Sequence, residues 1–258
     1  MLYLPGGRRG QPHRRIRMRL RAVVFALLLF TLALIGSSSH AVARTNAPRL
    51  APNHKISQST SSNWSGYSAI NGRYTTVSAS WKQPTASCTS QTTYSSFWVG
   101  LDGDGSNTVE QTGTSADCSG GTPRYYAWYE MYPKFPVNLS IAVRPGDSMS
   151  GSVTTDGSGH FTLHIHDGTT GGDFVTTQTL KKARLASAEA IAEAPSGSGG
   201  VLPLTNFGTA SFSSVTVNGQ AIGAFNPDRI DMVGNGYTKA TTSALSGGSA
   251  FSVTWRHS

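Results

Sequence analysis

The sequence of 258 residues predicts an all-β fold, an antiparallel sandwich or barrel, for the part of the chain that follows residue 43. Ser and Thr supply 58 of the 215 residues after that position, in company with Val, Tyr, Phe and Trp. Thr, Val and aromatic side chains suit a half-buried pleated sheet, whereas Gly, Asn, Asp and Ser favour turns. Both kinds of residue alternate along the chain in short blocks, which is typical of antiparallel strands joined by tight turns.

Four segments carry the clearest strand pattern: residues 124–132, 160–166, 211–217 and 250–255. In the second of them, Phe161, Leu163 and Ile165 point to one face and three histidines point to the other. Turn-forming residues separate such runs at 102–105, 144–147, 155–157 and 218–219. This spacing of strands and turns predicts an antiparallel architecture.

The segment 180–194 is the exception, because it is rich in Ala, Leu, Lys and Glu and its intrinsic propensity is helical. We nevertheless expect a strand here, since pairing within a sheet overrides propensity. In either conformation, Glu189 and Glu193 are four residues apart and share one face.

The net charge of +8 belongs to the N-terminal end of the chain. Residues 1–43 contain seven arginines and no acidic residue, whereas the remainder has 14 basic and 13 acidic residues. A nearly neutral remainder gives no reason to expect a nucleic-acid partner.

The order of residue types in 1–43 predicts a secretory signal peptide. An arginine-rich stretch precedes the uncharged, mostly apolar residues 22–35, and an A-x-A pattern follows at 41–43. The alternative is a membrane anchor, but 14 residues fall short of the about 20 that span a bilayer. We therefore expect secretion, no stable membrane anchoring after cleavage, a linker or short pro-segment at 44–60, and one domain at 61–258.

The two cysteines, Cys88 and Cys118, both lie in the part expected to be exported. In an oxidising compartment the simplest arrangement is one disulfide, and the alternative is two free thiols. We favour the disulfide.

Common catalytic and metal-binding signatures are missing. The sequence contains no G-x-S-x-G, H-E-x-x-H, phosphate-binding loop or dinucleotide fingerprint. The residues 102–105 resemble the start of a calcium loop, but its twelfth position is Gly113 instead of Glu. His160, His164 and His166 could hold a metal, yet a solvated strand face explains them equally well. We expect no metal and no cofactor.

Several segments together resemble the glutamic peptidases, the eqolisin family. In order they are NWSG at 63–66, FWVGLDGD at 97–104, VEQTG at 109–113, AWYEMYP at 127–133, SAEAIAEAP at 187–195 and LTNFGT at 204–209. The resemblance covers most of residues 61–258. It implies a β-sandwich of two antiparallel sheets, of the concanavalin (lectin-like) type, and an endopeptidase active at acid pH on protein or peptide substrates.

The resemblance also implies a catalytic pair, Gln111 and Glu193. A carboxylate at Glu193 can take a proton from the attacking water and return it to the leaving amine. A neutral amide at Gln111 can position that water and donate to the oxyanion. Glu189 is the rival for the carboxylate role.

The substrate cleft implied by the resemblance includes Trp98, Asp102 and Glu130. Trp98 could instead pack in the core, and Asp102 could be an ordinary turn residue. Glu130 stands among aromatic residues, so its carboxylate needs a hydrogen-bond partner if it is buried.

Two other functions compete with peptidase activity. A β-sandwich with a Trp/Tyr-rich face also suits a non-catalytic carbohydrate-binding module, because fold alone does not fix function. A metal-dependent glycan hydrolase using the histidine face is the third hypothesis. For the peptidase we expect a monomer.

Overall fold

The computed structural model describes residues 42–43 and 60–258. The expected signal peptide and linker lie outside the described residues, apart from Val42, Ala43 and Thr60 at their ends. The described chain is built of strands, and only one 3-10 turn (η1, Ile222–Phe225) is helical within it. None of the helices in this part is long and apolar enough to cross a membrane.

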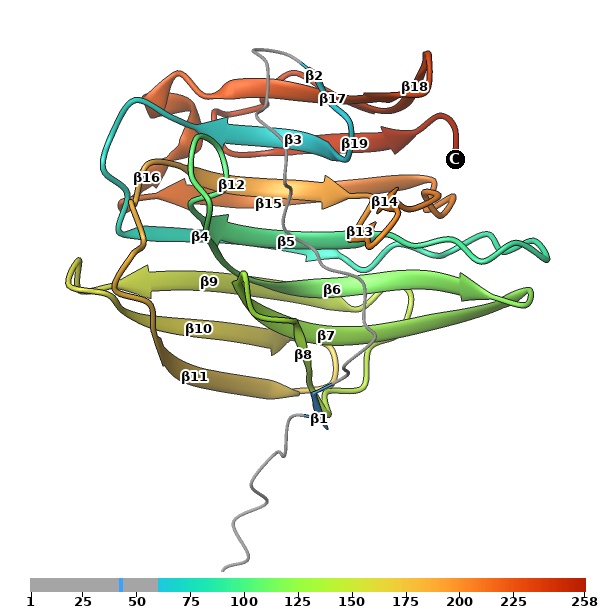
Figure 1. Cartoon of the computed structure of the whole chain (residues 1–258), viewed down its shortest axis with the longest axis horizontal. Coiled ribbons are helices and arrows are strands. Elements are labelled where there is room, and N and C mark those ends of the chain that lie inside the picture. Colours follow the sequence, from blue (N-terminus) through green and yellow to red (C-terminus); the bar gives the residue numbers. More distant parts are fainter. Residues whose placement is uncertain (1–41, 44–59) are drawn as a thin grey trace, which may run out of the picture. The chain divides into compact units, whose positions relative to one another are not determined.

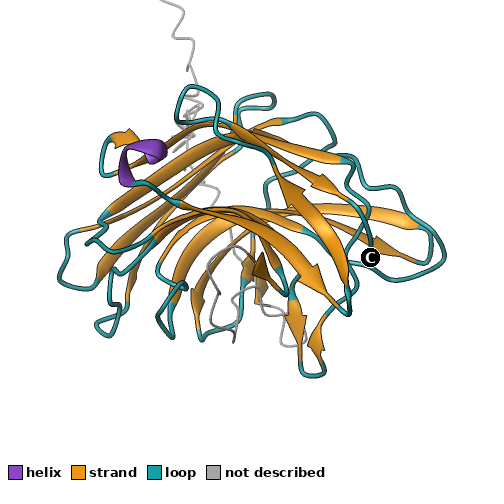
Figure 2. Cartoon of the chain, turned by 90° about the horizontal axis from the view of Figure 1, so that it is seen from above, coloured by secondary structure: helices purple, strands orange, loops and turns teal. Residues whose placement is uncertain are grey.

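Two antiparallel layers make up the described domain, and Figure 2 shows them one above the other. The first layer, sheet I, has the order β1–β8–β7–β6–β5–β12–β3–β17. Its strands are β1 Val42–Ala43, β8 Val137–Asn138, β7 Thr122–Tyr132, β6 Val109–Ser119, β5 Ser96–Leu101, β12 Ala188–Glu193, β3 Trp64–Ala69 and β17 Asp228–Gly234.

The second layer, sheet II, has the order β11–β10–β9–β4–β15–β19–β18–β17. Its other strands are β11 Asp173–Thr179, β10 His160–Asp167, β9 Ser148–Thr155, β4 Thr76–Lys82, β15 Thr209–Val217, β19 Phe251–Trp255 and β18 Tyr237–Thr242. Short strands complete the fold: β2 Thr60–Ser61 beside β17, β16 Gln220–Ala221 beside β15, and the separate hairpin of β13 Ser196–Gly197 with β14 Gly200–Val201.

Strand β17 belongs to both layers. Its first residues, Asp228 to Ile230, pair with β3 of sheet I, and the residues from Met232 onward pair with β18 of sheet II. The two sheets are therefore hydrogen-bonded to one another along this edge, beside β3 and β18 (Figure 1).

The structure confirms the all-β prediction and the strand expected near 180–194. β12 occupies only residues 188–193 and pairs with β3 on one side and β5 on the other. Hydrogen bonds from two neighbours fix these alanines and glutamates as a central strand, which overrides their helical propensity. The turn at Asn218 and Gly219, both with positive φ, joins β15 to β16 as the sequence indicated.

The main hydrophobic core lies between the sheets. It combines the inward-facing residues of sheet I, such as Phe97, Val99 and Ala190, with those of sheet II, such as Phe161 and Phe212. Cys88 and Cys118 form the expected disulfide, which ties the loop before β5 to the end of β6. Packing between the layers thus uses the inner face of sheet I. The opposite face, called the outer face below, carries a separate set of side chains.

Candidate active site

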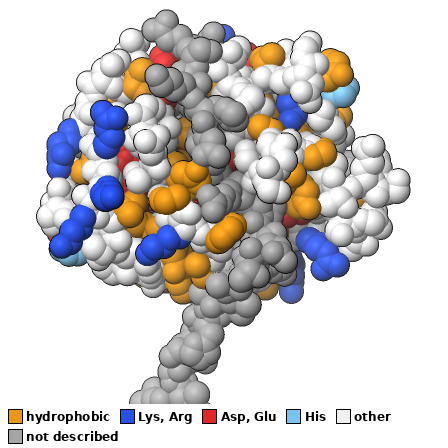
Figure 3. Space-filling model, in the orientation of Figure 1, with side chains coloured by type: hydrophobic (Ala, Val, Ile, Leu, Met, Phe, Trp, Pro, Cys, Tyr) orange, Lys and Arg blue, Asp and Glu red, His pale blue; other side chains and the backbone are white. Residues whose placement is uncertain are grey.

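The outer face of sheet I carries a second hydrophobic cluster, the outer-face cluster, that is separate from the core between the sheets. It consists of Trp64, Trp98, Val109, Trp128, Tyr132, Ile191 and Ile230, all on strands of sheet I or β17. In Figure 3, which has the orientation of Figure 1, apolar side chains gather in the middle of the visible face and Lys and Arg lie mostly toward its rim. Carboxylates show little surface, since all four glutamates of the domain are buried.

Strand register places the predicted catalytic residues on this outer face. Gln111 of β6 is paired with Gly100 of β5 and with Glu130 of β7, and Glu193 of β12 is paired with Ser96 of β5. Paired residues of an antiparallel ladder share a face, and residues two apart on one strand share it too. Gln111, Glu130 and Glu193 therefore project from the same face, with β5 between the two catalytic candidates.

The indole of Trp98 is the side chain that stands between them. On β5 it lies midway between Ser96, beside Glu193, and Gly100, beside Gln111. Its Nε1 donates to Oε2 of Glu193 at 2.8 Å, and its ring packs edge-on against Trp64 with centroids 4.9 Å apart. The structure thus places Trp98 on the candidate site instead of in the core between the sheets.

Two strand glycines make room for that indole. A Cβ at Gly113 would lie 2.6 Å from Cβ of Trp98, and one at Gly100 would lie 3.0 Å from Cζ3 of its ring. Real Cβ atoms do not approach so closely without movement of a neighbour. Any larger residue at Gly113 would therefore displace the group that holds Glu193.

Glu193 is a buried carboxyl with two donors. Besides Trp98, Asn63 donates from Nδ2 to Oε1 at 3.1 Å. Burial raises the pKa of Glu193 well above its ordinary value, and the charge of Glu130 raises it further against the opposing effect of these donors. The strand register agrees with this effect, because Glu130 and Glu193 project from the same face of sheet I.

Gln111 is oriented by the same glutamate. Its Nε2 donates to Oε2 of Glu130 at 2.7 Å, and its Oε1 accepts no hydrogen bond from any described residue although the residue is fully buried. No direct hydrogen bond between Gln111 and Glu193 is present in the described part of the chain. Glu130 therefore links the two catalytic candidates: it accepts a hydrogen bond from Gln111, and its charge raises the pKa of Glu193.

Glu189, the rival to Glu193, also points to the outer face, directly across Gly100 from Gln111 in register. Its carboxyl, however, accepts from Oγ of Ser68 at 3.3 Å. Burial raises its pKa well above the ordinary value, and the charges of Asp104 and Asp102 add to that effect. The charges that raise the pKa of Glu189 thus belong to the acidic loop after β5, whereas the charge that raises the pKa of Glu193 belongs to Glu130.

Asp102 sits in that loop and is engaged with main chain. Its Oδ2 accepts from the backbone N–H groups of Arg184 and Leu185 at 2.8 Å, and its Oδ1 accepts from that of Ala186 at 2.8 Å. The side chain is fully buried. These contacts anchor the segment that leads into β12.

A further carboxyl, Glu110, faces the interior on the opposite side of β6. It is fully buried, and burial together with the Asp102 charge raises its pKa to about 9. It is consequently neutral at acid and neutral pH.

Sequence reasoning missed two residues of this site, Asn63 and Trp64. Both belong to the NWSG segment at the start of the domain, and β3 carries Trp64 to a position directly opposite Glu193. Only the resemblance of that segment signalled that it mattered.

The histidine face holds no metal cluster among the described residues. His160 pairs with Asp156 at 2.7 Å, and His164 and His166 share Asp173. These exposed pairs lie on sheet II, away from the outer face of sheet I.

The chain was compared with known families and proteins. The family model described as the Peptidase A4 family matches residues 62–255. Aspergillopepsin-2 of Aspergillus niger is 27% identical over 230 residues, which are 76% of this chain and 78% of the relative. Scytalidopepsin B of Scytalidium lignicola is 35% identical over 157 residues, 55% of this chain and 59% of the relative.

Solved structures give the same picture. A crystal structure of scytalido-glutamic peptidase with a transition state analog inhibitor superposes with a TM-score of 0.67 at 26% identity, covering 77% of this chain and all of that one. Aspergilloglutamic peptidase from Aspergillus niger gives a TM-score of 0.58 at 26% identity, covering 63% of this chain and 99% of that one.

Proposed function

The chain belongs to the Peptidase A4 (eqolisin) family and is a glutamic-type endopeptidase, and we propose that Gln111 and Glu193 are its catalytic pair. The observation that carries this proposal is the outer face of sheet I, where Trp98 holds the Glu193 carboxyl and Glu130 holds the Gln111 amide.

Glu193 acts as the general base and then as the general acid. As a carboxylate it takes a proton from water as the water oxygen bonds to the peptide carbonyl carbon, and it later gives that proton to the leaving amine as the C–N bond breaks. Such proton transfer contributes about 10²–10⁴-fold to the rate. The donors Trp98 and Asn63 keep the carboxyl in place through both steps.

Gln111 positions the water and stabilises the oxyanion. One N–H of its amide is taken by Glu130, which leaves the other N–H and Oε1 for the reacting groups. Oε1 can accept from the attacking water, and the remaining N–H can donate to the developing oxyanion. An amide carries no charge at any pH, so it adds no repulsion to the Glu130–Glu193 pair.

That pair gives a physical reason for activity at acid pH. The charge of Glu130 raises the pKa of Glu193, so the pair tends to keep one proton, and the site then carries a single negative charge. Once both carboxyls have lost their protons, two negative charges meet at the site and disfavour the working arrangement. Activity therefore falls on the acid side when Glu193 is protonated and on the alkaline side when the pair carries two charges.

We propose protein or peptide substrates that lie extended across the outer face of sheet I. A structure of the similar scytalido-glutamic peptidase contains a peptide based transition state analog, which supports a peptide ligand here. Trp98, Trp64 and Trp128 would line apolar subsites. We also propose that residues 1–43 direct secretion and that the mature domain, 61–258, works as a monomer outside the cell.

The test uses two matched glutamate variants of the secreted protein. Wild type, Glu193→Gln and Glu189→Gln are incubated with denatured protein substrate from about pH 2 to about pH 7, and new peptide ends are counted. We expect cleavage by wild type and Glu189→Gln and almost none by Glu193→Gln, with all three unfolding at similar temperatures. Loss of cleavage in Glu189→Gln alone would transfer the catalytic role to Glu189.

A further inference from the structure

A cavity of about 520 Å³ lies apart from the outer-face cluster, at the hairpin that follows β12. Its walls come from the loop before β5, from residues 201–203, from the β17–β18 turn and from the residues after β19. None of the residues that line it belongs to the outer-face cluster or is a catalytic candidate. A volume of this size suits a small organic ligand.

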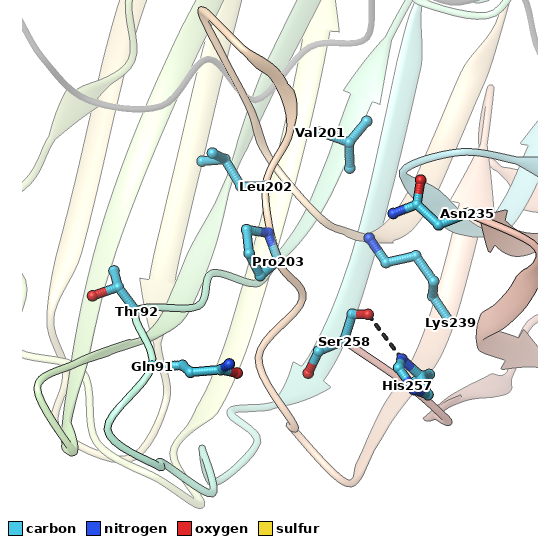
Figure 4. Close-up of a pocket in the computed structure, with 9 residues that line it drawn as sticks. All are labelled: Gln91, Thr92, Val201, Leu202, Pro203, Asn235, Lys239, His257 and Ser258. Carbon is cyan, nitrogen blue, oxygen red and sulfur yellow. Dashed lines mark hydrogen bonds between the residues drawn. The ribbon is translucent and has the colours of Figure 1, made fainter.

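Lys239 extends into this cavity, as Figure 4 shows. The residue is only 4% exposed, and burial lowers its pKa. The ion pairs of the described residues are all between His and Asp, and no described residue accepts a hydrogen bond from the Lys239 ammonium. A buried ammonium without a counter-charge is costly, so its presence needs a reason.

A β-bulge in the β17–β18 ladder directs the Lys239 side chain. The β17–β18 ladder shifts register between the Met232–Ala240 and Val233–Thr238 pairs, which leaves Lys239 as the extra residue of a β-bulge. Bulges commonly redirect a side chain. The carbonyl of Lys239 also accepts the N–H groups of Arg256 and His257, which holds the chain after β19 against the same cavity.

The remaining lining has a polar side and an apolar side. The His257 ring, stacked on Tyr237 at 4.6 Å, stands beside Lys239, and Asn235 offers an amide. Val201, Leu202 and Pro203 supply the apolar wall. No Asp or Glu side chain lines the cavity, and its basic side chains are Lys239 and His257; Nδ1 of His257 is hydrogen-bonded to a main-chain oxygen of Ser258, which also lines it.

We propose that the Lys239 cavity binds the carboxylate end of a peptide whose last side chain is apolar. The carboxylate pairs with the Lys239 ammonium, the Asn235 amide hydrogen-bonds the terminal peptide group, and the side chain rests on residues 201–203. Each turnover of a peptidase creates a new carboxylate end, so cleavage products are a ready source of this ligand.

The cavity has a direct connection to the catalytic strand. The N–H of Leu202 donates to the carbonyl of Pro195 at 2.8 Å, and Pro195 lies two residues beyond Glu193. Occupancy of the cavity would therefore fix the hairpin that continues from β12.

Binding is measured by titration calorimetry at about pH 5, where a terminal carboxylate is ionised. The probes are N-acetyl-Leu-Leu with a free carboxylate, the same dipeptide as its C-terminal amide, N-acetyl-Asp-amide and inorganic phosphate. The proteins are wild type, Lys239→Met and the control Lys182→Met, a lysine exposed on the surface. The assay needs no catalysis, so it stands independently of the role given to Gln111 and Glu193.

We expect the free dipeptide to bind wild type and Lys182→Met equally, and to bind at least tenfold more weakly to Lys239→Met or when amidated. Lys239→Met should unfold at a temperature equal to or above that of wild type, which shows that it folds. Equal binding of acid and amide, or equal binding by Lys239→Met, would overturn the proposal. Binding of N-acetyl-Asp-amide in place of the dipeptide would overturn the terminal-carboxylate assignment, and binding of phosphate alone would show a simple anion site.

Discussion

The two glutamates of β12 are four residues apart on one strand and one face, yet their surroundings differ. Glu193 receives the indole N–H of Trp98 and the amide of Asn63, and its pKa responds to Glu130. Glu189 receives the hydroxyl of Ser68, and its pKa responds to Ser187, Asp104 and Asp102. Both are fully buried, and burial raises both pKa values.

Burial and a raised pKa therefore do not separate a catalytic carboxyl from a structural one in this protein. The difference lies in what each carboxyl faces. The Glu193 end of β12 adjoins the indole of Trp98 and the amide of Asn63, whereas the Glu189 end lies across Gly100 from Gln111 and adjoins the loop that Asp102 holds in place. The following predictions test this contrast from its strongest consequence to its weakest.

Gln111→Ala should lower activity the most. It removes the donor proposed for the oxyanion, and loss of one such donor typically lowers kcat by about 10²–10³-fold. Steady-state kinetics on a short peptide measure this, with KM changing much less than kcat. An unaltered kcat would exclude Gln111 from the reaction.

Asp102→Ala should damage the Glu189 end of β12 without touching catalysis. It leaves the backbone N–H groups of residues 184–186 without their acceptor, at a cost of about 1–3 kcal/mol for each donor that stays buried. We expect a loss of about 3 kcal/mol in the free energy of unfolding, measured with urea. A normal stability with a raised KM would instead make Asp102 a substrate-binding residue.

Trp98→Phe tests the hydrogen bond that distinguishes Glu193. The change keeps an aromatic ring but removes the N–H that favours the ionised carboxyl, so the pKa of Glu193 should rise further. The acid limb of kcat/KM is then expected to move to higher pH by about one unit. Ser68→Ala, which removes the donor of Glu189, should leave that limb where it is.

Glu110→Gln should change activity least, because Glu110 concerns neither end of β12. The pKa of Glu110 is raised to about 9 in the folded protein, so the fold binds this proton more tightly than the unfolded chain does. Its contribution to stability is complete below about pH 4 and is lost progressively up to about pH 9. The variant should flatten the fall in melting temperature over that range, and an unchanged slope would contradict the assignment.

The sequence predicts the strands better than the contacts. Alternation in 160–166 and the Asn218–Gly219 turn are local signals, and the structure confirms both. The strand at 188–193 goes against local propensity, because hydrogen bonds from β3 and β5 decide it. Those partners lie about 90 to 125 residues away along the chain, where no local pattern reaches.

The site residues show the same limit. The pairing of Gln111 with Glu130 depends on the β6–β7 register, and the role of Asn63 depends on where β3 delivers it beside β12. The Lys239 bulge gives no sequence signal at all, because one extra residue in a hairpin is visible only in the ladder. Composition and motifs therefore identify the family and its chemistry, while register supplies the neighbours.

The shared strand β17 has a mechanical consequence. Because β17 is hydrogen-bonded to both sheets, it joins the two layers along one edge. Thermal bending must then separate the layers chiefly at the opposite margins, near β8 and β11. In sheet I only β3 lies between β12 and β17. The strand that carries both glutamates is therefore close to the joined edge, where displacement of one layer relative to the other is least.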